Sequence, residues 1–372
     1  MSIRYLVGAL FLVLLLPAPF SAADELDARI DSLYDQELKE LFLWLHQNPE
    51  LSHMEHKTSA RLASELESFG YDVHTGIGGT GIVALLENGE GPLVMFRADM
   101  DGLPVEEKSG LPYASKAKQV DWDGNEVFVM HACGHDAHTA MLAGAARLLS
   151  QHRHSLNGTV DFFFQTGEEG YFGAKVVLDE GLFEAPESPD AIFAIHITPL
   201  LDSGKFTSKP GPLLAAADSW EIHLKGQGGH ASMPHNAVDP IPAACDVVEA
   251  LQLMVTRRIN VFNPVVITTT QINAGTTNNV IPETAELCGT LRATSEASRL
   301  DAEEGIHRVA HGVALAHGVE AEVTIESGYP VTFNDVDFTG FASSVARDIL
   351  GAQGYSELPS PIMGGEDFSY IL

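Results

Sequence analysis

Nine consecutive residues run Met130-His131-Ala132-Cys133-Gly134-His135-Asp136-Ala137-His138, and they include three histidines, a thiol and a carboxylate. An apolar run over 127–130 precedes them and predicts a strand, while the run over 137–151 that follows predicts a helix. Open α/β sheets place their binding and catalytic groups where a strand ends and the next helix begins. The stretch therefore predicts an α/β fold with a chemical site at this junction.

Other apolar runs extend the pattern along the first half of the chain. Residues 24–70 predict two helices, separated at Asn48-Pro49 because proline disfavours a helical residue before it. Strands are expected at 82–86, 93–96, 159–165 and 191–195, and a further helix is expected at 173–181. Strands that alternate with helices predict a mostly parallel sheet with helices on both faces.

A different order of elements begins near Leu213. Strands are predicted at 219–225, 264–273, 283–292 and 320–327, and helices at 239–255 and 295–317. The resulting order βαββαβ is typical of a ferredoxin-like α/β sandwich. We therefore expect residues 213–328 to form a domain inserted into a metal-binding catalytic domain that comprises residues 24–212 and 329–372.

The N-terminus has the pattern of a signal peptide. Arg4 precedes an apolar run over 6–16, and small residues at Ser21-Ala22-Ala23 offer a cleavage site. The run is too short to span a bilayer. We expect residues 1–23 to be removed and the protein to be exported, either periplasmic or secreted, with no membrane association afterwards.

Charge and cysteine content exclude other classes. The chain carries 51 Asp+Glu against 21 Lys+Arg, a net charge of −30, which disfavours nucleic acid or an anionic membrane as a partner. Three cysteines in 372 residues do not form a disulfide framework. A hydrophobic content of 45% is sufficient for a sizeable core.

Chemically useful side chains follow the predicted strands of the first domain. They are Asp99 after 93–96, the Cys133/His135 stretch after 127–130, Glu168-Glu169 after 159–165 and His196 after 191–195. Because the carboxyl ends of parallel strands share one edge of a sheet, we expect these residues to converge. Thiolate, imidazole and carboxylate groups together are suited to zinc and other first-row divalent ions.

The paired glutamates indicate how such a site would work. Glu168 and Glu169 are adjacent, so their side chains diverge; one can bind metal while the other faces a water molecule as general base. Simpler interpretations remain open for single residues. His131 can end a strand, Asp136 can cap the following helix and also orient a ligand, and His138 can be solvated or support a ligand. His196 alone could be a core histidine.

Motifs along nearly the whole mature chain resemble the M20 family of metallopeptidases and aminoacylases, in the branch of hippurate hydrolases, N-acyl-amino-acid amidohydrolases and auxin-conjugate hydrolases. The motifs are His46-Gln-Asn-Pro-Glu-Leu-Ser52, Arg97-Ala-Asp-Met-Asp-Gly-Leu-Pro104, Met130-His-Ala-Cys-Gly-His-Asp-Ala-His138, Thr166-Gly-Glu-Glu-Gly170, Gly228-Gly-His-Ala-Ser232, Asn278-Asn-Val-Ile-Pro282 and Gly365-Glu-Asp-Phe-Ser369.

The resemblance implies a role for each matching residue. Two divalent ions, zinc or manganese, would be held by Cys133, His135, Glu169 and His196, with Glu168 as general base and Asp99 supporting the metal site. His230 would stabilise the oxyanion from across a homodimer. Asn279 and Arg292 would lie near the substrate, and a guanidinium is suited to a carboxylate.

The expected activity is hydrolysis of the amide bond of N-acyl amino acids to a carboxylic acid and a free amino acid. An exopeptidase, a carboxypeptidase or dipeptidase, is the alternative, and a non-catalytic binding protein is a third. The family supplies a last metal-binding histidine after the Gly365–Ser369 motif, whereas this sequence ends at Leu372 and has no histidine beyond His317. We therefore expect the sequence to be a fragment.

Overall fold

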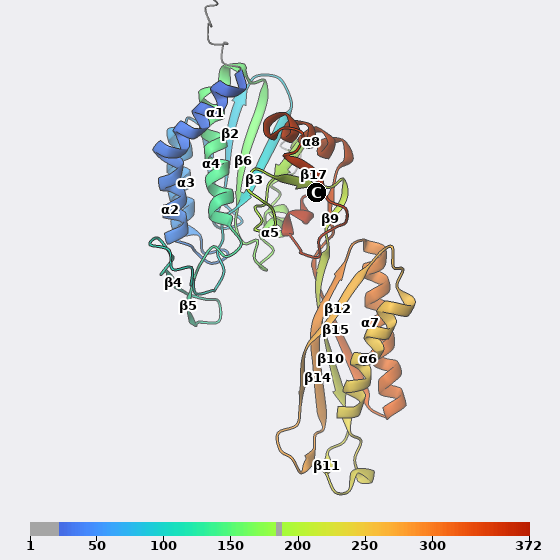
Figure 1. The fold of residues 1–372 in the computed structure, drawn as a ribbon. Coiled ribbons are helices and arrows are strands. Elements are labelled where there is room, and N and C mark those ends of the chain that lie inside the picture. Colours follow the sequence, from blue (N-terminus) through green and yellow to red (C-terminus); the bar gives the residue numbers. More distant parts are fainter. Residues whose placement is uncertain (1–21, 184–187) are drawn as a thin grey trace, which may run out of the picture.

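The computed structural model describes residues 22–183 and 188–372 (Figure 1). Two units are visible: a larger α/β unit that contains the N-terminal helices and the end of the chain, and an elongated unit of residues 216–329. We call the second the inserted unit. All but the last two residues of the predicted signal peptide lie outside the described residues.

The larger unit is built on a five-stranded sheet in the order β1-β2-β6-β3-β7. Its strands are β1 (Asp72–Ile77), β2 (Gly81–Asn88), β3 (Leu93–Asp99), β6 (Gly158–Gln165) and β7 (Ala191–Ala194). The predicted α/β class is confirmed. The pairs β6–β3 and β3–β7 are parallel, whereas β1–β2 and β2–β6 are antiparallel, so the sheet is mixed and not mostly parallel as predicted. The connection between β1 and β2 is too short for the crossover that parallel strands require.

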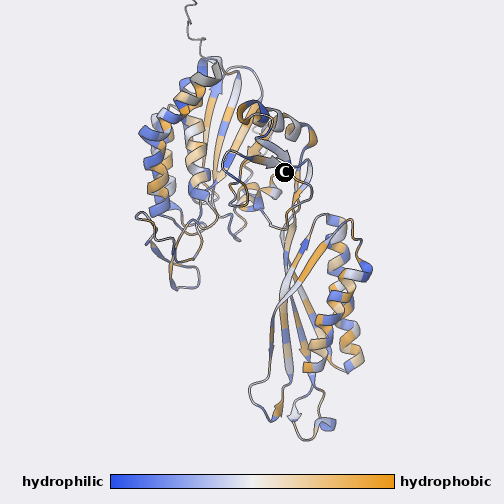
Figure 2. Cartoon of the chain, viewed as in Figure 1, coloured by the Kyte–Doolittle hydropathy of each residue, from blue (hydrophilic) through white to orange (hydrophobic). Residues whose placement is uncertain are grey.

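Helices lie on both faces of this sheet, as predicted. One face is covered by α2 (Lys39–Gln47), α3 (His56–Ser68) and α4 (His135–Gln151), and α5 (Gly173–Asp179) lies against the other. Successive phenylalanines of β6 divide between the two cores. Phe162 and Phe164 join the cluster under α2–α4, while Phe163 packs with Val177 of α5, because side chains alternate along a strand. Apolar residues accordingly concentrate along these strands (Figure 2).

Two N-terminal elements precede α2 without interruption, α1 (Ala22–Leu33) and a π-helical turn, Tyr34–Leu38. Near the end of the chain, α8 (Val336–Leu350) lies beside the sheet edge, where Phe338 contacts Phe193 of β7 with ring centroids 5.9 Å apart. No helix among the described residues is long and apolar enough to cross a membrane.

The strand predicted at 127–130 is not part of the central sheet. Glu126–Phe128 forms β5, which pairs only with β4 (Lys118–Val120) in a hairpin, and Met130 makes one isolated bridge to Leu103. The cause is local. The Asp121 carboxylate accepts the N–H of Asn125 at 2.7 Å and closes a tight turn, so β5 pairs with its neighbour in sequence.

The inserted unit has the predicted order βαββαβ. Its elements are β10 (Ala216–Lys225), α6 (Pro240–Arg258), β12 (Val265–Ala274), β14 (Thr284–Ala293), α7 (Glu296–His317) and β15 (Glu320–Tyr329). The strands form an antiparallel sheet in the order β12-β14-β10-β15, and α6 and α7 cover one face over a separate apolar core. Asp239 and Ser295 cap the two helices.

Short elements complete the chain. At the far end of the inserted unit, β11 (Gly229–His230) pairs with β13 (Val280–Ile281). In the larger unit, β9 (Gly211–Leu214) pairs with β16 (Thr332–Asn334), and β8 (Phe206–Ser208) with β17 (Tyr355–Glu357). Three-residue and four-residue 3₁₀ turns occur at Arg153–Ser155, Pro234–Asn236 and Asp367–Tyr370.

Candidate metal centre

A sharp turn positions the predicted ligands at the start of α4. Gly134 precedes the helix with a φ of 92°, and a Cβ there would lie 2.5 Å from the side chain of Ile197, so glycine is required. The N-cap position belongs to Gly134, which rules out the N-cap interpretation of Asp136. Asp136 instead accepts a bond from His46, with Oδ2 and Nδ1 2.7 Å apart. The turn leaves Cys133 and His135 free to face one point.

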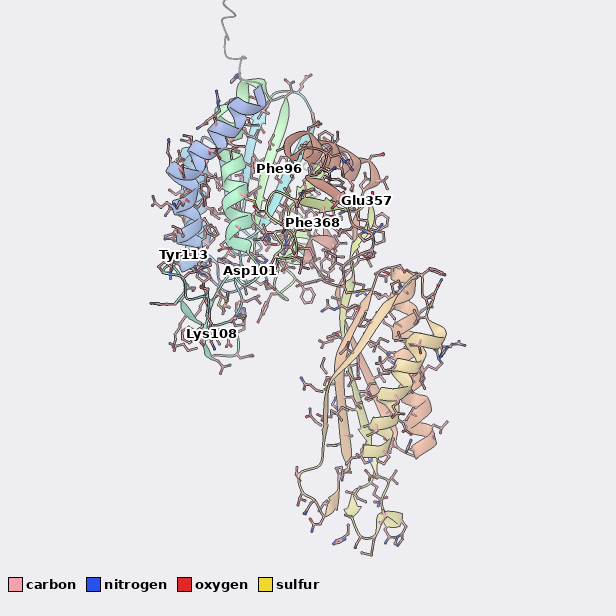
Figure 3. All side chains as sticks on the ribbon, in the orientation of Figure 1. Phe96, Asp101, Lys108, Tyr113, Glu357 and Phe368 are labelled. Carbon is pink, nitrogen blue, oxygen red and sulfur yellow. The ribbon has the colours of Figure 1, made fainter. Side chains whose placement is uncertain are left out.

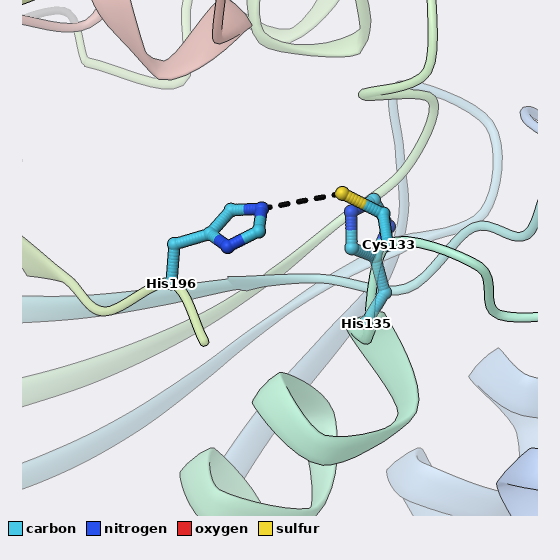
Figure 4. Close-up of side chains that lie close together, drawn as sticks. All are labelled: Cys133, His135 and His196. Carbon is cyan, nitrogen blue, oxygen red and sulfur yellow. Dashed lines mark hydrogen bonds between the residues drawn. The ribbon is translucent and has the colours of Figure 1, made fainter. Parts of the chain in front are cut away.

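Three candidate ligand side chains converge there (Figure 4). The Sγ atom of Cys133 lies 3.3 Å from Nε2 of His196, which follows β7. Ligand atoms of Cys133, His135 and His196 all lie within 4.8 Å of one another. This arrangement matches the predicted convergence, although Cys133 reaches the site from the turn before α4 and not from a strand of the sheet.

The cluster favours the ionised thiol. Burial opposes ionisation of Cys133, but hydrogen bonds with His135 and His196 outweigh it and lower the pKa of the thiol. The hydrogen bond to Cys133 likewise raises the pKa of His196. Because the thiolate is the form that binds a metal ion, this environment prepares Cys133 as a ligand.

A second cluster shares His135 with the first. Nε2 of His135 lies 3.8 Å from Oε1 of Glu169 and 3.9 Å from Oε2 of Glu168, and the ligand atoms of these three residues lie within 4.8 Å of one another. Buried polar atoms without a hydrogen-bond partner are costly. Nε2 of His135 and Oε1 of Glu169 are such atoms. Divalent ions between them would satisfy both, so the donor set fits the metals that the sequence predicted.

Asp101 holds these ligands in place. Its Oδ1 lies 3.2 Å from Nδ1 of His135, and its Oδ2 accepts the backbone N–H of Glu169 at 2.9 Å and the hydroxyl of Ser52 at 2.5 Å. It lies at the lower end of the sheet in Figure 3. A carboxylate behind a ligating histidine fixes its orientation and tautomer. The sequence indicated supporting roles for Asp99 and Asp136 but not for Asp101, although Asp99 and Asp101 both lie in the Arg97–Pro104 motif.

Asp99 supports the site through His138. Its Oδ1 lies 2.7 Å from Nδ1 of His138, whose Nε2 accepts the N–H of Ile197 at 2.9 Å. Both ring nitrogens of His138 therefore bond to protein partners, and His138 anchors the residue after His196. His131 is also buried, and burial lowers the pKa of its ring to about 4, so it is neutral at pH 7.

Glu168, the predicted general base, lies in a cluster of buried carboxylates. Glu366 and Asp367 lie beside it, and Arg97 bonds to both at 2.9 and 3.0 Å and to Asp99 at 2.8 Å. Burial first, then the neighbouring carboxylates, raise the pKa of Glu168 well above its ordinary value. A carboxylate with this tendency accepts a proton readily, as a general base requires.

The residues predicted on the inserted unit are not gathered at this centre. His230 lies on β11, and the carbonyl of Asn279 accepts the N–H of Ala231, so both are at the far end of the inserted unit. Arg292 of β14 is closer to the larger unit. A Cβ on Gly365 would lie 3.1 Å from its Nη1. Arg292 also lines a hollow of about 280 Å³ with Gly170 and Tyr329.

These features define a metal-dependent hydrolase: side chains that could hold metal ions and a buried carboxylate meet at the carboxyl edge of an open sheet. Residues 95–372 match the sequence model of peptidase family M20/M25/M40, and the chain belongs to that family. It is a hydrolase of amide bonds.

Relatives and solved structures agree with this assignment. The chain is 38% identical to a hippurate hydrolase of Campylobacter jejuni, over 88% of this chain and 82% of that protein. It is 41% identical to an N-acetylcysteine deacetylase of Bacillus subtilis, over 87% of this chain and 82% of that protein. A crystal structure of a dinuclear metal-binding M20 peptidase from Bacillus subtilis superposes with a TM-score of 0.76 and 35% identity, covering 92% of this chain and 86% of the other.

Proposed function

We propose that the protein hydrolyses the amide bond of N-acyl amino acids, releasing a carboxylic acid and a free amino acid. The observation that carries this proposal is that His135 joins two clusters of metal-ligand side chains directly beside the buried carboxylate of Glu168. Cys133, His135, Glu169 and His196 would hold two divalent ions. Such ions lower the pKa of water and polarise an amide carbonyl.

The protein's own groups perform the remaining steps. Glu168 takes a proton from the attacking water and later gives it to the amine that leaves. Asp101 keeps His135 and the Glu169 backbone fixed while this happens. A guanidinium suits a carboxylate bidentately, so Arg292, which lines the hollow beside the Glu168–Phe172 loop, is assigned the carboxylate of the substrate.

The metal identity is part of the proposal. A thiolate and two histidines in the ligand set favour zinc. Carboxylate ligands are suited to manganese as well, so we propose zinc or manganese.

The acyl amino acid substrate is supported by relatives named for hippurate, N-acetylcysteine and auxin conjugates with amino acids. A second candidate is an exopeptidase, since a thermostable carboxypeptidase of Saccharolobus solfataricus is 37% identical over 88% of this chain. Purified protein loaded with zinc or manganese should cleave N-acetyl and N-benzoyl amino acids with a higher kcat/KM than matched dipeptides. Faster cleavage of the dipeptides would select the exopeptidase instead.

A homodimer is the second part of the proposal. His230 lies on β11 at the far end of the inserted unit. A role for His230 at the metal centre therefore requires a second copy of the chain. Within the part of the chain that the structure describes, β12 has a partner strand on one side only, and this free edge is suited to aligning two copies.

Mixed dimers test this arrangement. Glu168→Gln and His230→Ala chains, each inactive alone, are co-expressed. If His230 acts across the dimer, a site that combines the intact Glu168 of one chain with the intact His230 of the other is complete, and about one quarter of all sites are of this kind. Activity at that level is expected. If the mixture stays as inactive as the separate variants, His230 does not act in trans.

We further propose export of the protein, on the basis of Arg4, the apolar run over 6–16 and the small residues before Asp24.

A further inference from the structure

Tyr329 is the last residue of β15, where the inserted unit returns to the larger unit. Its phenol oxygen bonds to the loop after β6 in two ways. It donates to the backbone carbonyl of Glu168 and accepts the backbone N–H of Gly170 at 2.7 Å. One side chain of the inserted unit therefore holds the backbone on both sides of Glu169.

An irregularity in β15 aims Tyr329 at this loop. Ser219 of β10 faces Glu326, whereas Ala217 faces Tyr329, so two residue steps on β10 match three on β15. Side chains alternate along a regular strand, and Tyr329 would then lie on the opposite face from Glu326. The extra residue is a β-bulge, which turns Tyr329 to the open face of the sheet.

The backbone before Tyr329 is fixed within the inserted unit. The N–H of Gly328 donates to Oδ1 of Asp218 at 2.9 Å, and Arg299 of α7 bonds to both oxygens of that carboxylate at 2.5 and 2.9 Å. A Cβ on Gly328 would lie 2.0 Å from the carbonyl oxygen of Ala217, so this close approach requires glycine. Tyr329 therefore moves with the inserted unit as one body.

The larger unit holds the same loop from the other side. The buried carboxylate of Glu55 accepts the N–H of Gly167 at 2.9 Å and the hydroxyl of Thr166 at 2.8 Å. Asp101 accepts the N–H of Glu169. The loop that carries Glu168 is thus bonded to both units, and within the described residues Tyr329 is the side chain that bonds it to the inserted unit.

We propose that Tyr329 is a positioning residue that couples the placement of Glu168 to the orientation of the inserted unit. This rests on the proposed role of Glu168 as general base. A rotation of the inserted unit either breaks both phenol bonds or shifts the backbone of Glu168. The base is therefore held in place when the inserted unit, which carries Arg292 and so the proposed substrate contact, is correctly oriented.

The test is Tyr329→Phe, which removes the hydroxyl and keeps the ring that packs against Phe172 and Tyr370, with centroids 5.4 and 6.3 Å away. We expect kcat to fall about 10- to 100-fold, because small misplacements of a catalytic group have effects of this size. KM and metal content should be unchanged, because Arg292 is intact and Asp101 still accepts the backbone N–H of Glu169. Amide exchange at Gly170, measured by mass spectrometry on the metal-free protein, should be faster.

The matched control is Tyr370→Phe. The Tyr370 hydroxyl donates to the carbonyl of Gly328 at 2.9 Å, so this variant also loses one phenol bond at the same junction, but that bond does not reach the loop. It should keep the original kcat and Gly170 exchange. Equal behaviour of the two variants would overturn the proposal, as would rapid Gly170 exchange in the unmodified protein. Failure of the proposed function has a different signature, absence of turnover in the unmodified protein, and the exchange comparison then still decides the role of Tyr329.

Discussion

Replacement of Glu168 by glutamine should lower kcat by about 10²–10⁴-fold, the usual contribution of a general base, while two metal ions per chain remain bound. Glutamine keeps the shape of the side chain but cannot take up a proton. The ligands in the two clusters stay unchanged, because Glu168 is the member assigned to the proton and not to the metal. Steady-state kinetics on an N-acyl amino acid and metal analysis of the same sample provide the measurement.

Glu169→Gln is the matched comparison, since the same chemical change is made one residue along the chain. Oε1 of Glu169 is buried without a hydrogen-bond partner, as expected of an atom that faces a metal ion. This variant should lose metal as well as activity. A Glu168→Gln protein with normal turnover, or one that loses metal as Glu169→Gln does, would refute the assignment of the base.

The fold could be predicted from the sequence where local pattern and tertiary structure agree. The βαββαβ order of the inserted unit followed from the residue pattern, since burial alternates along β10, β14 and most of β15 and each helix has an apolar stripe. The prediction that residues 127–130 belong to the central sheet was wrong, because a short apolar run does not indicate which strand it pairs with. The turn at Asp121 determines that pairing, and a four-residue run carries no signal of it.

The sequence predicted which residues form the candidate site, but it did not predict all the residues that hold them in place. Cys133, His135, Glu168, Glu169 and His196 meet as predicted because strands and a helix start deliver them to one edge. The roles of Asp101 and Tyr329 could not be predicted from the sequence, for physical reasons. Asp99 and Asp101 are two residues apart, so both side chains can face the same side, and spacing alone does not show which one bonds to Nδ1 of His135. Tyr329 reaches the loop after β6 only because of a β-bulge, and no residue pattern in β15 predicts that bulge.

The buried carboxylates around Arg97 have both a structural and an electrostatic effect. Arg97 bonds to Asp99, Glu366 and Asp367, which come from distant parts of the chain. Removal of one member of a buried charge network leaves the others uncompensated. The network therefore holds the Glu366-Asp367 segment onto the sheet, and the same concentration of negative charge raises the pKa of Glu168 beside it.

Cys133→Ala should abolish one of the two metal sites and lower turnover by more than about 100-fold, the loss that removal of an outer-sphere partner alone can reach. Cys133 is the thiol whose pKa is lowered by its histidine neighbours, and its Sγ lies 3.3 Å from His196. Its loss leaves His135 and His196 without a third donor in that cluster. Metal per chain, measured by mass spectrometry after dialysis, should fall together with kcat.

Cys245→Ala is the control, because Cys245 is an exposed thiol on α6 of the inserted unit, and it should change neither quantity. The comparison separates ligation from general thiol chemistry, since a thiol reagent that acts only through Cys133 should inactivate the Cys245→Ala protein as fast as the unmodified one. Two metal ions per chain and normal turnover in Cys133→Ala would mean that the histidines and carboxylates suffice, and Cys133 itself would then have no part in metal binding.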